Sequence, residues 1–332
     1  MQGISAKIIS RAKELMRDGT VNKVVGWKAG EFFYDCEPYV FETEESLDGL
    51  VYNRFCAANL SKYMIKNSIA TGEDSLKVLV LLKPCDTYSF NQLLTEHRIV
   101  RENVYILGVG CEGMCDIDRI RENGFKGITG IGENADGKTL TVRTLYGDGE
   151  VVIDDVLVNK CEFCKGKAHK IYDELISDNE DEGPRGDRFA GVRDIEAMSP
   201  GERFAFWKGE LSKCIRCNAC RNACPACSCR KCVFDNNASG IASKANTDSF
   251  EEKMFHIIRA FHVAGRCTDC GECSRVCPQG IPLHLFNRKY IKDINEFYGD
   301  YAAGEEAGQR GPLISYTEGD IEPAAVSDKG GK

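Results

Sequence analysis

The hydrophobic pattern of the first half of the chain predicts an α/β domain. Two short continuous apolar runs, 77–83 (KVLVLLK) and 103–109 (NVYILGV), are typical of strands that are buried on both faces of a sheet. Residues 86–97 between them have helical spacing, so the three segments predict a strand–helix–strand unit with two parallel strands. We therefore expect a largely parallel sheet.

Further elements are expected on both sides of this unit. We predict helices at 5–16, 60–69 and 168–176, extended segments at 21–27 and 32–41, and a hairpin of 139–145 and 151–158 around a turn at 147–149. Another group of helices is predicted at 200–212, 248–264 and 282–298. The C-terminal part should therefore be mainly α-helical, and the whole chain α+β.

These patterns divide the chain into four parts. A charged segment with Gly and Pro, 179–188, cannot build a packed element and is predicted to be a linker. It separates an α/β domain at 1–178 from a helical domain at 189–300. Residues 301–332 are rich in Gly and acidic side chains, so we expect a flexible tail.

Two cysteine runs in the helical domain share the spacing CxxCxxCxxxC. The runs are Cys214, Cys217, Cys220 and Cys224, then Cys267, Cys270, Cys273 and Cys277. In ferredoxins with two [4Fe–4S] clusters, the fourth cysteine of each run binds the other cluster. We therefore expect Cys277 to join the first three cysteines of the first run, and Cys224 to join those of the second. A pair of zinc sites is the alternative, but it leaves the third cysteine of each run unused.

Five other cysteines indicate a third site. They are Cys85 in KPCD, Cys111 and Cys115 in GCEGMCD, and Cys161 and Cys164 in CEFC. The first two segments follow predicted parallel strands, whose carboxyl ends meet at one edge of a sheet. We expect a third cluster at this edge. The alternative is that Cys85 and Cys111 are small buried residues and that CEFC belongs to a zinc site.

Three cysteines that neither pattern uses, Cys227, Cys229 and Cys232, lie within six residues. With a fourth ligand such as Cys36 or Cys56 they would form a fourth cluster or a zinc site, and otherwise they are spare or alternative ligands. His262 and His284 flank the second run, where they would donate hydrogen bonds to cluster sulfur or be solvated at the surface.

Gly108, Gly110 and Gly113 form GxGxxG after a predicted strand and before a predicted helix. This context is typical of a dinucleotide phosphate site. Glycines are equally needed where the backbone approaches a cluster, so both interpretations stay open.

The first half of the chain resembles a known family. A strand ending in KPCD, a strand ending in GVGCEG, a hairpin, and CEFC followed by KIYDEL, within 78–176, resemble the β-subunit family of deazaflavin-coenzyme-reducing hydrogenases and formate dehydrogenases. The resemblance implies a [4Fe–4S] cluster and FAD. It makes Cys85, Cys111, Cys161 and Cys164 candidate ligands, with Cys115 as a substitute for Cys111. Residues 267–283 are similar to the helical dicluster ferredoxin modules of heterodisulfide-reductase-like complexes.

Charge and composition limit the classes of partner. The net charge of −8 excludes a general attraction to nucleic acid, and 18 cysteines suit a reducing compartment. No segment approaches the roughly 20 apolar residues of a membrane span, so we expect a cytoplasmic protein. We predict an iron–sulfur electron-transfer subunit of an anaerobic oxidoreductase complex, with protein subunits and a ferredoxin or deazaflavin coenzyme as partners. The alternatives are a flavoenzyme with its own FAD and a zinc-bearing assembly scaffold.

Overall fold

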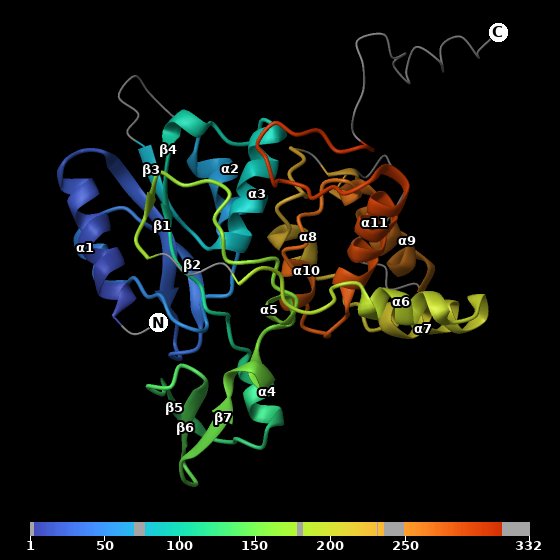
Figure 1. The fold of residues 1–332 in the computed structure, drawn as a ribbon, viewed down its shortest axis with the longest axis horizontal. Coiled ribbons are helices and arrows are strands. Elements are labelled where there is room, and N and C mark those ends of the chain that lie inside the picture. The colour runs from blue at the N-terminus through green and yellow to red at the C-terminus, as the bar shows by residue number, and fades with distance from the viewer. Residues whose placement is uncertain (1–2, 70–76, 178–181, 231, 236–248, 314–332) are drawn as a thin grey trace.

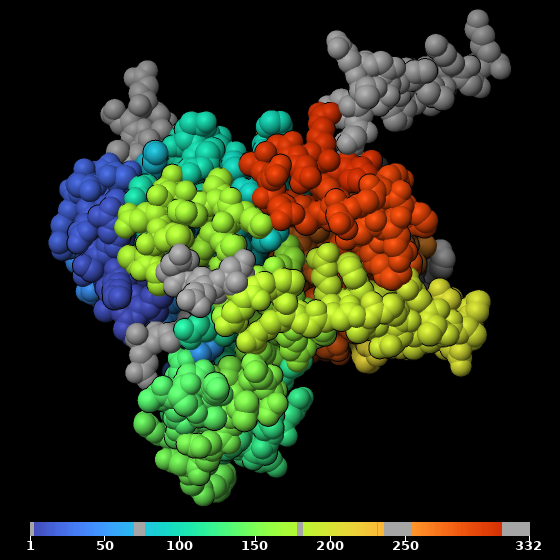
Figure 2. All heavy atoms as spheres, viewed as in Figure 1, coloured from blue at the N-terminus to red at the C-terminus, as the bar shows by residue number. Residues whose placement is uncertain are grey.

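The computed structural model describes residues 3–69, 77–177, 182–230, 232–235 and 249–313. The chain forms two halves that lie side by side, a sheet with its helices and a group of helices (Figure 1). A small second sheet projects from the first half, as the green lobe in Figure 2 shows.

A five-stranded sheet forms the core of the first half. Its order is β2 (Cys36–Phe41), β1 (Val21–Ala29), β3 (Lys77–Leu82), β4 (Val104–Gly108) and β8 (Glu174–Leu175). Strands β1, β3, β4 and β8 pair in parallel, and β2 pairs with β1 antiparallel. Helix α3 (Pro84–Thr95) connects β3 to β4, and α1 (Ile4–Arg17) packs against β1. The predicted strand–helix–strand unit is therefore present.

The predicted helix at 168–176 was wrong, because these residues extend the sheet edge instead. The amide of Asp173 donates to the carbonyl of Ile106 at 2.9 Å, and that of Ile176 donates to Gly108 at 3.0 Å. The carboxylate of Glu174 accepts a hydrogen bond from Arg11 Nε at 2.9 Å. Pairing with β4 and α1 thus outweighs the local helical pattern. The predicted helix at 60–69 is shortened to a 3₁₀ turn, η2 (Ser61–Tyr63), and α2 (Met64–Asn67).

The second sheet contains the predicted hairpin. Strand β6 (Thr139–Thr144) pairs antiparallel with both β5 (Ile128–Glu133) and β7 (Gly149–Val152). Helix α4 (Ile117–Glu122) packs beside it, with Asp116 as its N-cap. The last predicted strand ends early, because the chain continues as a 3₁₀ turn, η4 (Ile153–Val156).

Helices make up the second half. They are α6 (Ala190–Ala197), α7 (Pro200–Ser212), α8 (Ala219–Ala223), α9 (Ser249–Val263), α10 (Glu272–Arg275) and α11 (Leu283–Tyr298). The three long predicted helices are confirmed as α7, α9 and α11, although Asp248 lies outside the described residues. Helix α7 begins at a capping box in which Ser199 and Glu202 satisfy each other's amides. Short elements elsewhere are α5 (Asn159–Glu162), η1 (Glu45–Gly49), η3 (Arg101–Asn103) and η5 (Val233–Asp235).

Polar contacts join the two halves where α3 faces α8 and α10 (Figure 1). The hydroxyls of Ser89 and Thr268 lie 2.8 Å apart, and both residues are buried. Lys62 Nζ donates to the carbonyl of Cys224 at 2.7 Å. These contacts fix the cysteine runs against the end of the parallel sheet.

The flexible tail was predicted to begin too early. Tyr301 donates its hydroxyl to Gly265 at 3.0 Å, and the amide of Gly308 donates to Thr95 Oγ1 at 2.9 Å. Gly304 has a φ of 75°, and a Cβ there would lie 1.8 Å from the carbonyl oxygen of Tyr88, so only glycine fits. The segment 301–313 is therefore held against the rest of the chain at 301–304 and at 311, while 305–310 are exposed. Residues 314–332 and part of the predicted linker, 178–181, lie outside the described residues.

In the part of the chain that the structure describes, none of the helices has both the length and the apolar character that crossing a membrane requires.

Candidate metal centres

The two cysteine runs have the same backbone conformation. The residues before and after the second cysteine have positive φ in both runs: Arg216 (56°) and Asn218 (62°) in the first, Asp269 (54°) and Gly271 (67°) in the second. Alternation of right- and left-handed residues turns successive amides toward one concave side, which suits an anion such as an iron–sulfur cluster. The repeated spacing therefore produces a repeated cradle.

The first cradle lies at a cavity that also receives a cysteine from the second run. Cys214, Cys217, Cys220 and Cys277 all line it, together with Phe255 and other apolar side chains. This is the crossed set that the spacing predicts. Burial raises the pKa of Cys220 to about 11, so a thiolate there needs positive charge nearby.

The second crossed set consists of Cys224 and the first three cysteines of the second run. Burial raises the pKa values of Cys267, Cys270 and Cys273, and the nearby Cys224 raises each of them further. The four thiols are therefore close enough to repel one another when ionised. Metal coordination relieves such repulsion, because the positive charge of the metal stabilises the deprotonated thiols that bind it. Among the described residues, no three His, Cys, Asp or Glu side chains converge closely enough to hold a single metal ion.

Arg259 supplies positive charge between the two crossed sets. Its side chain is 1% exposed, and none of its three nitrogen atoms has a hydrogen-bond partner among the described residues. Burial alone would lower the pKa of the guanidinium, but four thiols around it, Cys273, Cys220, Cys224 and Cys227, raise it. A buried arginine without partners is costly. Its donors and its charge therefore fit anionic clusters on either side.

The histidine beside the first site is His256, which sequence reasoning missed. Its Nε2 lies 3.3 Å from the Sγ of Cys214, and burial lowers its pKa to about 3, so the ring is neutral. His256 and Arg259 are three residues apart and share one face of α9. His284, for which the sequence left a bond to cluster sulfur or solvation at the surface open, is only 9% exposed and places Nδ1 2.9 Å from the Oγ of Ser274. His262 is exposed and lies beside Phe234.

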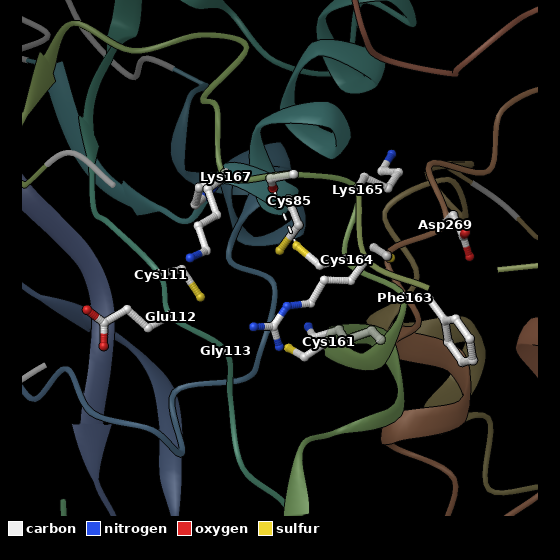
Figure 3. A pocket seen from close by; sticks show the side chains of 15 residues that line it. Cys85, Cys111, Glu112, Gly113, Cys161, Phe163, Cys164, Lys165, Lys167 and Asp269 are labelled. Carbon is white, nitrogen blue, oxygen red and sulfur yellow. Dashed lines mark hydrogen bonds between the residues drawn. The ribbon is translucent and has the colours of Figure 1, made fainter. Parts of the chain in front are cut away.

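A third cavity is lined by the four cysteines of the N-terminal motifs. Cys85 is the second residue of α3, shortly after β3, and Cys111 follows β4, so the parallel pairing brings both to one edge of the sheet. Cys161 in α5 and Cys164 after it complete the set. Figure 3 shows the four side chains directed toward a common space.

The surroundings of this third cavity favour a negatively charged group. Four cationic side chains line it, Lys160, Lys165, Lys167 and Arg185, against two carboxylates, Glu112 and Asp269. Burial raises the pKa of Cys161 to about 12, so the thiolate form again depends on added positive charge. Cys270 of the second set lines the same cavity. The second and third sites are therefore neighbours.

Four other predicted residues, Cys115 and the three glycines of GxGxxG, occupy the following positions. Cys115, the suggested substitute for Cys111, is 3% exposed in the apolar core beside the small sheet and does not line the cavity. In the glycine motif, a Cβ at Gly108 would lie 2.5 Å from the Cδ2 of Leu175, and Gly113 lines the thiol cavity with a φ of 101°. Gly110 accepts a hydrogen bond from Tyr52 at 2.8 Å. Close packing therefore explains Gly108, and Gly113 has a φ that favours glycine beside the thiol cavity, whereas the carbonyl contact of Gly110 does not require glycine.

The remaining cysteines do not form one site. Cys227, Cys229 and Cys232 line a groove between the two halves. Cys36 and Cys56, suggested as the fourth ligand, instead lie together, with Sγ atoms 3.4 and 3.7 Å from Asn53 Oδ1. Neither of them lines the groove.

Comparisons with known proteins agree with the cysteine pattern. Residues 210–281 match the family model of the 4Fe-4S dicluster domain. The chain is 24% identical over 340 residues to the F420-dependent formate dehydrogenase subunit beta of Methanocaldococcus jannaschii, covering 84% of this chain and 87% of the relative. It is 25% identical over 315 residues to the F420-dependent formate dehydrogenase 1 subunit beta of Methanococcus maripaludis, covering 76% and 78%.

A solved structure of the F420-reducing [NiFe] hydrogenase complex from Methanosarcina barkeri, obtained with xenon derivatization, contains a chain with a TM-score of 0.38 and 14% identity. The match covers 48% of this chain and 61% of that chain, less than two thirds of its length.

The resemblance predicted from the cysteine motifs is therefore confirmed. The relatives are subunits of oxidoreductases. This chain combines a 4Fe-4S dicluster segment with an α/β half, and over most of its length it is similar to the beta subunits of F420-dependent formate dehydrogenases.

Proposed function

We propose that the chain is an iron–sulfur electron-transfer subunit of an anaerobic oxidoreductase complex, with three [4Fe–4S] clusters. Two would be held by the crossed sets of the dicluster segment and the third by Cys85, Cys111, Cys161 and Cys164. The observation that carries the proposal is the position of Cys270, which belongs to the second set and also lines the third cavity. Thiols of both the first and the second set raise the pKa of Arg259, so Arg259 lies near both. The three sites therefore form a row.

The residues of this chain would bind the clusters, exclude water from them and adjust their reduction potentials. A bound [4Fe–4S] cluster supplies reversible one-electron reduction. Thiols would hold each cluster, and apolar residues such as Phe255 and Leu283 exclude water from the first site. Arg259, Lys160 and Lys165 provide positive charge, which favours the more negative, reduced state. Because the relatives are F420-dependent formate dehydrogenase subunits, we propose a deazaflavin coenzyme and a catalytic subunit as the electron-exchange partners.

Iron content tests the third site. Anaerobically prepared protein should contain about twelve iron atoms per chain, against about eight if the dicluster segment alone is loaded. Cys85→Ala should lower the content by about four, because it removes one thiolate from the third cavity. Cys36→Ala, which changes a thiol outside that cavity, should leave it unchanged. Unaltered iron in Cys85→Ala would show that the cavity holds no cluster.

The same preparations distinguish the alternatives. Bound FAD, together with oxidation of a hydride donor by the isolated chain, would favour a flavoenzyme. Zinc in place of iron and sulfide would favour an assembly scaffold.

Replacing Arg259 should shift the potentials of the two dicluster clusters. A unit charge at roughly 7 Å contributes about 2 kcal/mol at an effective dielectric constant near 20, which is roughly 100 mV for one electron. In Arg259→Met, both potentials should therefore fall by about this amount in an EPR-monitored redox titration. Arg259→Lys should restore much of the shift, and Lys208→Met, which removes an exposed charge on α7, should not change them. Unchanged potentials in Arg259→Met would contradict this role.

A further inference from the structure

A groove of about 1060 Å³ separates the two halves on the side of Cys227, Cys229 and Cys232. Its walls come from α2, the segment after α3, the end of the first cysteine run, and the end of α9. Unlike the thiol cavities, it is large enough to admit part of another molecule's surface.

The groove is strongly basic although the chain as a whole has a net charge of −8. Its cationic lining residues are Lys62, Lys66, Arg98, Arg221, Arg230, Arg259 and Arg266, and Asp235 is the one acidic side chain among its described lining residues. Asp235 offsets Arg221 at 3.0 Å, and Glu96 lies against Arg266. A large positive excess remains.

Exposed apolar side chains accompany these charges. Tyr63 (44% exposed), Ile69 (61%) and Val100 (43%) all line the groove. Large apolar residues beside arginines are typical of a protein interface, whereas a site for a small anion needs only the charges.

The floor of the groove leads directly to the second candidate cluster. Cys227 lines the groove, and its backbone amide donates to the carbonyl of Cys224 at 3.1 Å. Lys62 Nζ donates to the carbonyls of both residues, at 2.7 Å to Cys224 and 2.8 Å to Cys227. An electron that enters at the groove would therefore be close to the proposed cluster ligand Cys224, which is three residues from Cys227 in the chain.

We propose that this groove docks an acidic electron-carrier protein of the small [4Fe–4S] ferredoxin class. The inference rests on the proposed function and adds the partner and its entry point. In the transfer, one electron leaves the reduced carrier, whose cluster is oxidised by one unit, and this chain is reduced by one unit. The basic residues steer the acidic carrier, and the exposed apolar residues stabilise the encounter.

The test is electron transfer from a reduced, acidic two-cluster ferredoxin to the full cluster-loaded chain, followed by stopped-flow absorbance at several salt concentrations. Lys66→Glu/Arg230→Glu reverses two exposed charges of the groove. Lys126→Glu/Lys138→Glu reverses two exposed charges on the small sheet and gives the same net charge. The groove variant should lose at least tenfold in the second-order rate constant at low salt and much of its salt dependence. The control should stay within twofold of the wild type.

Dithionite reduction and iron content separate the two proposals. If the wild type assembles no reducible clusters, the proposed function is wrong. If all three proteins contain the same reducible clusters but the groove variant accepts electrons as fast as the control, the docking proposal is wrong, and the groove serves a permanent subunit or a small anion. Lys66→Gln/Arg230→Gln, which removes charge without adding any, should give an intermediate rate.

Discussion

Replacing Cys224 by alanine is expected to remove the same cluster as replacing Cys270, although the two cysteines stand in different runs. The crossed arrangement places Cys224 with Cys267, Cys270 and Cys273, and this grouping agrees with the effect of Cys224, which raises the pKa of each of the other three thiols. Iron should fall by about four atoms per chain in both variants. The EPR signal that remains should be the same in both, and it should differ from the signal that remains in Cys217→Ala.

Cys227 is the necessary control, because its backbone amide donates to the carbonyl of Cys224 at 3.1 Å and its thiol is available as a replacement ligand. Cys227→Ala alone should retain the full iron content. Cys224→Ala/Cys227→Ala should lose the cluster even if Cys224→Ala keeps part of it. A Cys224→Ala spectrum that matches Cys217→Ala would show that the runs are not crossed.

The sequence was most informative where short-range pattern decides structure. The apolar runs that became β3 and β4 are buried on both faces of the sheet, so their pattern is continuous and easily recognised. Strand β8 was missed because a two-residue strand has no pattern of its own. Its position depends on a hydrogen bond to β4 and on Arg11, which is 163 residues away in sequence from Glu174.

In the candidate sites, too, the sequence predicts some residues and misses others. Cysteine spacing and strand order predict which thiols meet, and in the structure the first crossed set and the N-terminal set each line one cavity. Arg259 and His256 were missed because a charged residue in an amphipathic helix usually lies at the surface. Their common face on the helix that leads into the second run was the available signal. Whether a buried cation has a partner is a tertiary property, so sequence alone does not reveal it.

The buried contact between Lys160 and Glu272 should be the largest single contribution of one side-chain pair to the junction of the two halves. Lys160 Nζ donates to Glu272 Oε1 at 2.8 Å and to the carbonyl of Ala57 at 2.6 Å, and the two side chains are 6% and 2% exposed. Lys160→Met leaves the carboxylate buried with Arg275 as its remaining partner. Loss of one partner of a buried pair costs about 3–5 kcal/mol. The apparent melting temperature of the cluster-loaded chain should therefore fall by roughly 5–15 °C.

Two further variants test whether the loss of stability in Lys160→Met comes from leaving the Glu272 charge buried. Lys160→Met/Glu272→Met removes both charges and should recover much of the stability, because an apolar pair of similar volume is tolerated in place of a buried ion pair. Lys138→Met, at an exposed position, should leave the melting temperature unchanged.

Burial raises the pKa of Glu272, but Lys160 and Arg275 lower it by more, so the net shift is downward. The contribution is then present above the ordinary carboxyl pKa of about 4.3 and is lost as the pH falls through the depressed value. Equal melting temperatures for Lys160→Met and the wild type at neutral pH would show that the pair does not hold the two halves together.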